Sequence, residues 1–194
     1  MNKKDDLRIR KTKLSIKNAL YALLKEKPFE EISVIDITKK AMINRSTFYL
    51  HYKDKESLIQ SLSEEMFEEI EVYSSLITKE NLDRSKKYHT PFPHIVPILT
   101  YIKENPDFFK LIILSSYKHT FYLNLANRLS EKAIPLFSEI KPDKLVLNYG
   151  PSILINVISC ILTKWIKNDM KESPEEIAKL ITKIVLAVIT VDYK

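Results

Sequence analysis

The chain has 194 residues, a formal net charge of +6 and a single glycine, where about 14 glycines are usual for this length. P-loops and dinucleotide-binding turns need two or three glycines in short succession, because only glycine lets backbone N–H groups crowd a phosphate, so both kinds of site are excluded. The tight glycine turns that join β-strands are scarce for the same reason, and we expect an all-α protein.

The positive charge is concentrated near the N-terminus. Residues 1–55 contain fourteen basic and seven acidic side chains, a net charge of +7, whereas residues 56–194 contain 17 basic and 18 acidic side chains, a net charge of −1. A small basic unit joined to a larger near-neutral one is typical of a polyanion-binding domain on a neutral body. A general excess of lysine is the alternative explanation of the charge alone.

The first predicted helix covers about residues 7–25. Apolar side chains recur there three and four positions apart, which indicates a helix that buries one face. The stripe consists of Ile16, Ala19, Leu20, Leu23 and Leu24. Pro28 limits this helix, since the residue before a proline avoids the helical conformation.

Polar residues mark the beginnings of the next helices. Ser33, with Asp36 three residues later, has the spacing of a capping box for a short second helix. Asn44 is expected to cap a third helix over residues 45–51, and Asp54 a fourth, longer helix. Two short helices separated by a turn of about three residues, behind a longer first helix, are typical of a helix-turn-helix.

The third helix is expected to have an inner and an outer face. Phe48 and Tyr52, four residues apart, pack inward, so polar side chains are left on the outer face, where arginine and hydroxyl groups can reach base edges in a DNA groove. Residues after this helix and at helix N-termini are expected to contact phosphates. The candidate DNA-binding residues are Ser33, Asn44, Arg45, Ser46, Thr47, Tyr49, His51, Lys53 and Lys55.

Residues 33–58 read SVIDITKKAMINRSTFYLHYKDKESL. With Phe29 before it, this long pattern resembles the DNA-binding region of TetR-type transcriptional regulators. The resemblance implies an all-helical homodimer with a DNA-binding head and a ligand-responsive body. It also implies groove contacts from four residues and a phosphate contact from a fifth: Arg45, Ser46, Thr47, Tyr49 and Lys55.

The turn of this motif departs from the family's usual Ala-Gly-Val and reads Ala41-Met42-Ile43. A left-handed conformation at Met42 would cost on the order of 1 kcal/mol relative to glycine. We therefore expect a turn that is either slightly strained or differently shaped.

The rest of the chain predicts further helices, about nine in all. Residues 79–93 are polar, end in two prolines and are expected to form a long mobile loop. The later helices are placed at about 93–104, 107–115, 118–140, 143–169 and 174–190. Pro135 and Pro151 interrupt apolar patterns and predict kinks or breaks. We expect a helix-turn-helix DNA-binding domain at 1–55 and a ligand-binding and dimerisation domain at 56–194.

Two features of the C-terminal part concern ligand binding and dimerisation. Residues 105–110 and 164–178 look like a region shared by small regulators of the same family, including those linked to dihydroxyacetone kinase. Most aromatic side chains here belong to the core, with a pocket for an apolar or aromatic ligand as the functional alternative. Its candidates are Tyr101, Phe109, Tyr117, Phe121 and Trp165.

The last two helices carry apolar residues on wide arcs. One face of each serves the chain's own core, and the surplus predicts an antiparallel pair that meets its symmetry mate in a four-helix interface. A fully intramolecular core is the alternative. The interface candidates are Ile158, Leu162, Ile181, Val185 and Val188.

The remaining chemistry-bearing residues form no recognisable catalytic or metal site. No two of the four histidines are four residues apart, and one cysteine cannot complete a metal cluster. Cys160 lies in an apolar helix and is expected to be a buried, inert thiol, with redox sensing beside Lys164 as the alternative. We expect no enzyme activity, no metal and no cofactor.

The sequence shows no pattern typical of a signal peptide or a membrane-spanning segment. The N-terminus has no apolar segment of the signal-peptide kind, and the longest apolar stretch, residues 151–166, is too short to span a bilayer. We expect a cytoplasmic protein without a membrane partner.

The combined expectation is a ligand-responsive regulator that binds double-stranded DNA. As a homodimer it would bind a pseudo-palindromic operator and act as a repressor, released by a small-molecule effector. The alternative is a TetR-like co-regulator that acts mainly through a protein partner. The polar outer face of the third helix favours direct DNA contact.

Overall fold

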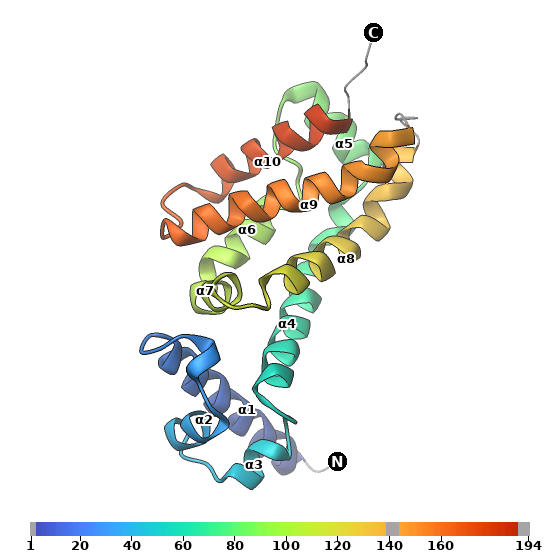
Figure 1. The fold of residues 1–194 in the computed structure, drawn as a ribbon. Coiled ribbons are helices and arrows are strands. Elements are labelled where there is room, and N and C mark those ends of the chain that lie inside the picture. The colour runs from blue at the N-terminus through green and yellow to red at the C-terminus, as the bar shows by residue number, and fades with distance from the viewer. Residues whose placement is uncertain (1–2, 139–143, 190–194) are drawn as a thin grey trace.

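The computed structural model describes residues 3–138 and 144–189. Within these ranges it contains ten α-helices, two 3₁₀ helices and no strand, which confirms the all-α prediction (Figure 1). The first part, which we call the head, comprises α1 (Lys3–Leu24), η1 (Phe29–Glu31), α2 (Val34–Lys40) and α3 (Arg45–Tyr49). The body comprises α4 (Lys55–Glu71), η2 (Val72–Leu76), α5 (Lys79–Tyr88), α6 (Ile95–Glu104), α7 (Pro106–Leu114), α8 (Lys118–Ser138), α9 (Lys144–Lys167) and α10 (Pro174–Ile189).

The head forms one end of an elongated molecule, and α4 runs from it into the body (Figure 1). α1 packs on α2, and α2 packs on α3. Each helix contributes a side chain that is 0% exposed, and these are Ile16 and Leu20 of α1, Ile37 of α2, Phe48 of α3 and Leu58 of α4. The apolar stripe of α1 is therefore buried, as its spacing predicts, because residues at i and i+4 face the same neighbour.

A second connection joins head and body beside α4. α1 packs on α7 of the body. The Lys25 Nζ atom lies 3.6 Å from the Asp107 carboxylate, and the Ser116 N–H donates to the Glu30 carboxylate over 3.3 Å. These contacts are exposed and add little stability individually, but they place polar groups of the head against α7 and the turn that follows it.

Residues 79–93 do not form the predicted loop. Most of the segment is α5, which is capped by Thr78, whose hydroxyl oxygen accepts from the Asn81 N–H over 3.2 Å. The helix ends at His89, which has a left-handed φ of 53°. The loop prediction was wrong because α5 has almost no apolar stripe: Ser85 is its only buried residue in the described part of the chain. Its cap and its helix-forming side chains define it instead.

The prolines at 135 and 151 do not break their helices. α8 includes Pro135, and α9 runs unbroken from Lys144 to Lys167 through Pro151. A helix-interior proline loses one backbone hydrogen bond, and α9 packs on α7, α8 and α10. The one glycine, Gly150, is buried in α9 and lacks a positive φ.

The outer face of α9 is exposed. Cys160 lies on this face, so the prediction of a buried thiol was wrong. The stretch Asn148–Lys167 is also long and apolar enough, by composition, to cross a membrane, contrary to the length expected from residues 151–166. One such helix is weak evidence for a span, and here its inner face packs against three other helices of the body.

Candidate nucleic-acid interface and ligand cavity

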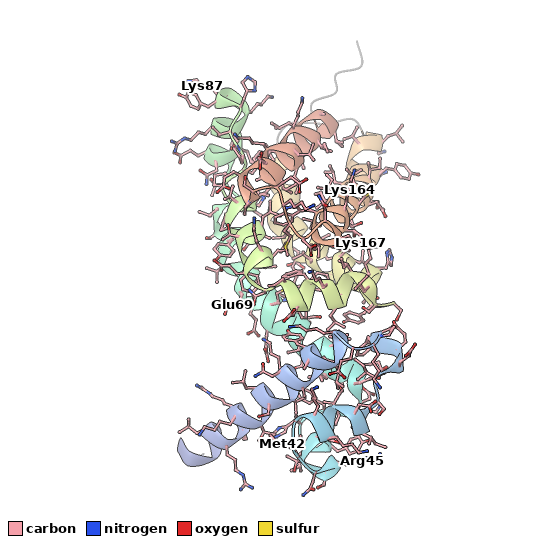
Figure 2. The ribbon with its side chains drawn as sticks, turned by 90° about the vertical axis from the view of Figure 1, so that its left-hand side faces the viewer. Met42, Arg45, Glu69, Lys87, Lys164 and Lys167 are labelled. Atoms are coloured by element: carbon pink, nitrogen blue, oxygen red, sulfur yellow. The ribbon has the colours of Figure 1, made fainter. Side chains whose placement is uncertain are left out.

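The outer face of α3 is polar and lies at the end of the head farthest from the body (Figure 2). Arg45, Ser46 and Tyr49 are exposed and Thr47 is half-buried, as their helical spacing predicts. Phe48, on the opposite face, is 0% exposed and its ring lies 5.6 Å from that of Tyr52. The anchored inner face therefore holds the outer side chains in one orientation.

Arg45 and Tyr49 also contact each other along α3. The Arg45 guanidinium donates to the Tyr49 hydroxyl over 3.3 Å and lies 5.8 Å from the centre of its ring. An arginine that already contacts a tyrosine one helical turn away is partly fixed in its rotamer. It therefore loses less side-chain freedom when it binds a partner than an arginine without such a contact. Of the five guanidinium N–H donors, one is used in this bond, and the others lie beside an aromatic hydroxyl.

The turn between α2 and α3 contains a left-handed Met42 with a φ of 55°. The Met42 N–H donates to the Lys39 carbonyl over 3.2 Å and the Ile43 N–H to the Thr38 carbonyl over 3.0 Å. This pair of bonds is a Schellman motif, in which glycine is the usual residue. The Met42 side chain is 91% exposed. The turn thus has the left-handed geometry that favours glycine, with the strain that a Cβ brings.

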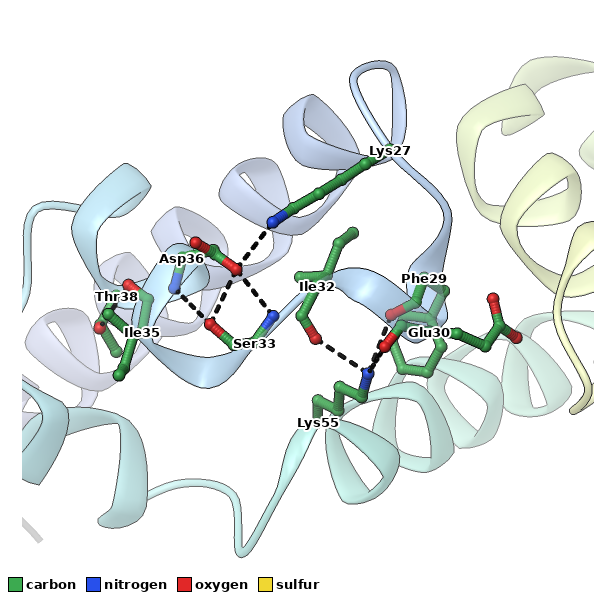
Figure 3. Close-up of polar contacts among 9 residues, drawn as sticks. All are labelled: Lys27, Phe29, Glu30, Ile32, Ser33, Ile35, Asp36, Thr38 and Lys55. Carbon is green, nitrogen blue, oxygen red and sulfur yellow. Dashed lines mark hydrogen bonds and ion pairs between the residues drawn. The ribbon is translucent and has the colours of Figure 1, made fainter.

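Ser33 lies in a closed polar cluster at the start of α2 (Figure 3). Its hydroxyl oxygen accepts from the Asp36 N–H over 3.2 Å, and its own N–H and hydroxyl donate to the Asp36 carboxylate over 2.9 and 2.7 Å. The Lys27 Nζ atom contacts the same carboxylate at 2.9 Å. The Ser33 N–H and the Lys27 ammonium hold the pKa of the Asp36 carboxyl far below its usual range. The Ser33 hydroxyl hydrogen is therefore engaged in the capping box.

Lys55 has a structural role in the head (Figure 3). Its ammonium donates to the carbonyls of Phe29, Glu30 and Ile32, each over 2.9 Å, and lies 4.6 Å from the centre of the Phe29 ring. An ammonium has three hydrogens, so these bonds use all of them. This geometry argues against the expected phosphate contact from the Lys55 side chain, which acts as a clamp between α4 and η1.

The remaining candidates lie near α3. Asn44 is the N-cap of α3, as predicted, but its side chain makes no capping hydrogen bond. His51 is half-buried beside Tyr52, with ring centres 6.3 Å apart. Lys53 is exposed in the turn before α4. The charge count also includes basic residues of α1, and four that are exposed lie on its N-terminal half: Arg8, Arg10, Lys11 and Lys13.

The body contains a cavity of about 260 Å³ between α6, α8, α9 and α10. It is lined mainly by aliphatic side chains. All five residues predicted for a dimer interface line it: Ile158, Leu162, Ile181, Val185 and Val188. The structure therefore turns these side chains into the protomer rather than outward.

The five aromatic ligand candidates do not line this cavity. Phe121 stacks on Phe67 with ring centres 5.1 Å apart and meets Phe109 edge to face at 6.2 Å, which places both in the core between α4, α7 and α8. The Trp165 indole N–H donates to the Glu172 carbonyl over 3.1 Å and fastens the turn between α9 and α10. Tyr101 and Tyr117 are half-buried against the core. Aromatic content alone did not distinguish core from pocket.

Among the described residues, His94 is one of three polar side chains of the cavity wall, with Tyr122 and Ser159, that were not among the ligand candidates. Its Nδ1 atom is buried and has no hydrogen-bond partner. Its ring lies parallel to that of Phe92, with centres 5.8 Å apart. Burial lowers the pKa of His94 to about 4, so the imidazole is neutral at pH 7. Elsewhere in the described ranges, no group of histidine, cysteine and carboxylate side chains could hold a metal ion.

Comparison with known proteins covers both parts of the chain. Residues 16–62 match the family described as bacterial regulatory proteins, tetR family, and residues 89–187 match the family described as transcriptional regulator C-terminal region. The chain is similar to a TetR transcriptional regulator of known structure from Streptococcus agalactiae 2603V, with 26% identity, a TM-score of 0.67 and coverage of 93% of this chain and 97% of that one.

Two further relatives match this chain over only part of their own length. An uncharacterized HTH-type transcriptional regulator, YxbF of Bacillus subtilis (strain 168), is 27% identical over 172 residues, which are 88% of this chain and 43% of YxbF. The HTH-type dhaKLM operon transcriptional activator DhaS of Lactococcus lactis subsp. lactis (strain IL1403) is 25% identical over 122 residues, 62% of this chain and 59% of DhaS. The chain thus spans about half the length of these relatives.

Proposed function

Because the chain belongs to the TetR family of bacterial transcriptional regulators, which are not enzymes, we propose that it regulates transcription by binding double-stranded DNA directly through α3. The observation that supports this most is the combination of a buried anchor and an exposed polar face on one short helix. Phe48 is fully buried, while Arg45 and Tyr49 are exposed and contact each other.

The roles of the candidate residues follow from their chemistry. Arg45 reads a guanine edge with two hydrogen bonds, and the hydroxyls of Ser46 and Thr47 contact bases or phosphates. Tyr49 and Lys53 contact backbone oxygens and set the position of the head on the duplex. Asn44, whose side chain makes no capping bond, is available to a phosphate, as is His51 at the far end of α3. Ser33 and Lys55 act by shaping the head.

We infer a homodimer that meets through the outer faces of α9 and α10. The residues predicted for the interface face the cavity, but the same helices expose other large apolar side chains. Leu145 is 65% exposed, Tyr149 63%, Ile153 51% and Leu180 44%. Covering this surface with a second copy would remove an apolar patch of a kind that marks interaction sites. Two-fold symmetry would place two recognition helices in successive major grooves of a pseudo-palindromic operator.

The body cavity is the proposed effector site, and release of DNA the proposed response. The cavity wall includes Ile77, which directly follows η2. Through η2 this residue is connected along the chain to α4, whose first residues adjoin the head. A ligand shifts this protein toward the DNA-free state only by the difference in its affinity for the two states. Repression is the proposed outcome. Activation is the second candidate, because DhaS is described as an activator.

The test is selection of genomic fragments by the purified protein, followed by binding measurements on the selected operator. Arg45→Ala is expected to weaken binding about 10- to 100-fold, corresponding to about 1–3 kcal/mol for a lost bidentate base contact, and to relax specificity at one position. Arg84→Ala, an exposed arginine on α5 of the body, is the matched control and leaves affinity unchanged. Binding that requires a second protein even at low salt would favour the co-regulator alternative.

A further inference from the structure

We propose that the body cavity binds an uncharged molecule of about ten non-hydrogen atoms that is mostly hydrocarbon and carries one hydroxyl group, which pairs with His94. This inference rests on the proposed function, since it names the chemical class of the effector. It is carried by the volume of the cavity, by the chemistry of its wall and by one polar atom that lacks a partner.

The volume limits the size of the ligand. An enclosed apolar cavity of about 150 Å³ holds benzene, which has six non-hydrogen atoms. In proportion, a cavity of about 260 Å³ holds roughly ten such atoms. This is at the small end of natural ligand pockets, so nucleotides and large polycyclic compounds are too big for it.

The wall determines the charge of the ligand. Within the described part of the chain, no lysine, arginine, aspartate or glutamate lines the cavity. A carboxylate, a phosphate or an ammonium group would therefore lose its hydration without gaining a partner, which is costly. The aliphatic side chains from α6, α8, α9 and α10 instead match a hydrocarbon body through burial of apolar area.

The polar side chains of the wall identify the one functional group. The Tyr122 side chain has Thr163 as a polar neighbour, and the Ser159 hydroxyl donates to the Asn156 carbonyl over 3.0 Å. His94 is different, because its side chain lines the cavity and its Nδ1 atom is buried without a partner. Nδ1 lies just behind the wall, so the imidazole turns about its Cβ–Cγ bond to meet the ligand. In a neutral imidazole, this nitrogen is a donor in one tautomer and an acceptor in the other. A hydroxyl group serves both tautomers, since it both donates and accepts.

The test uses the full chain and three probes of one length: 1-octanol, octanoate and octylammonium. Isothermal titration at pH 7.5 is expected to show one molecule of 1-octanol bound per protomer. Both charged probes are expected to bind at least about a hundredfold more weakly, because nothing in the cavity pairs with their charge. Octanoate or octylammonium binding as tightly as 1-octanol would overturn the proposal.

Variants of His94 test the hydroxyl contact. His94→Phe keeps a planar ring and removes both nitrogens, and it is expected to weaken 1-octanol binding by roughly tenfold, the worth of one hydrogen bond. His94→Gln restores a group that can donate and accept, and is expected to recover most of the affinity. His119→Phe, at an exposed histidine outside the cavity, is the matched control. Equal affinity in the wild type and His94→Phe would overturn the contact.

Operator binding is measured on the same preparations without any probe. A protein that binds its operator but not 1-octanol fails this inference alone. A protein that binds 1-octanol through His94 but binds no DNA supports the ligand class and fails the proposed function. Circular dichroism of each variant identifies any that does not fold, and His94→Gln then provides the comparison.

Discussion

The head and the body are both helical and both bury apolar side chains, but they differ in charge and in the space that they enclose. The head carries the excess charge, +7 over residues 1–55 against −1 over the rest. Polar devices define its shape: a capping box at Ser33, another at Asp54 and the three carbonyl contacts of Lys55. The body is held mainly by apolar packing around a cavity of about 260 Å³. The difference indicates a head built to present fixed side chains and a body with space for a ligand.

The largest expected effect is a loss of stability in the head, with the body still folded. Phe48→Ala removes a fully buried ring between α3 and the rest of the head. It is expected to cost about 3–5 kcal/mol of head stability. Hydrogen exchange would show faster exchange across α1–α3, with α6, α9 and α10 little changed. Leu50→Ala, at a residue 81% exposed just after α3, is the control and changes stability little. Uniform destabilisation of both parts would contradict their independence.

The next effect belongs to the body and depends on pH. Burial lowers the pKa of His94 to about 4 in the folded protein, whereas about 6.5 is usual in an unfolded chain. Between these values the unfolded state binds a proton that the folded state does not, so the free energy of unfolding falls as the pH is lowered from about 6.5 to about 4. The loss reaches about 3 kcal/mol at most.

Urea unfolding of the wild type and of His94→Phe at pH 7 and pH 4.5 measures this effect. The phenylalanine variant is expected to lose less stability on acidification, because it lacks the proton-binding group. His119→Phe keeps the wild-type dependence. If all three proteins lose the same stability between the two pH values, burial of His94 does not control acid sensitivity.

A smaller effect separates shape from charge within the head. Lys55→Met removes three hydrogen bonds to backbone carbonyls and is expected to cost about 1–3 kcal/mol of stability, leaving the salt dependence of operator binding nearly unchanged. Lys53→Met, at an exposed lysine two residues earlier, is expected to keep stability and to reduce the salt slope by about one phosphate contact. The reverse result would make Lys55 the phosphate ligand.

The smallest effect concerns the turn of the helix-turn-helix. Met42 is left-handed and 91% exposed, so its side chain gains little from packing. Met42→Gly is expected to stabilise the protein by about 0.5–1 kcal/mol, because glycine adopts this conformation without a Cβ clash. A rise in Tm of about 2–4 °C by scanning calorimetry would accompany 1 kcal/mol in a chain of this size. A lower Tm would mean that the methionine contributes a contact of its own.

Local features of the head could be predicted from the sequence. The capping box at Ser33 needs only two residues three positions apart, and the N-cap at Asp54 needs one residue; the structure adds Ser57, which completes a capping box at Asp54. The inward Phe48 and outward Arg45 follow from the helical period. The helix α5 was not predicted, because a polar helix has no apolar period. The expected capping hydrogen bond of Asn44 is absent, because a residue at the N-cap position need not turn its side chain toward the helix.

The sequence by itself determined the fold class, the family pattern of residues 33–58 and the faces of α3, since all of these depend on short-range spacing and on side-chain chemistry. Only the tertiary structure decided what the apolar surplus of α9 and α10 does. Val185 and Ile158 line a cavity, while Tyr149 and Ile153 remain exposed. A helix that is apolar on several faces buries whichever face its neighbours cover, and those neighbours, α6 and α8, are brought there by the fold.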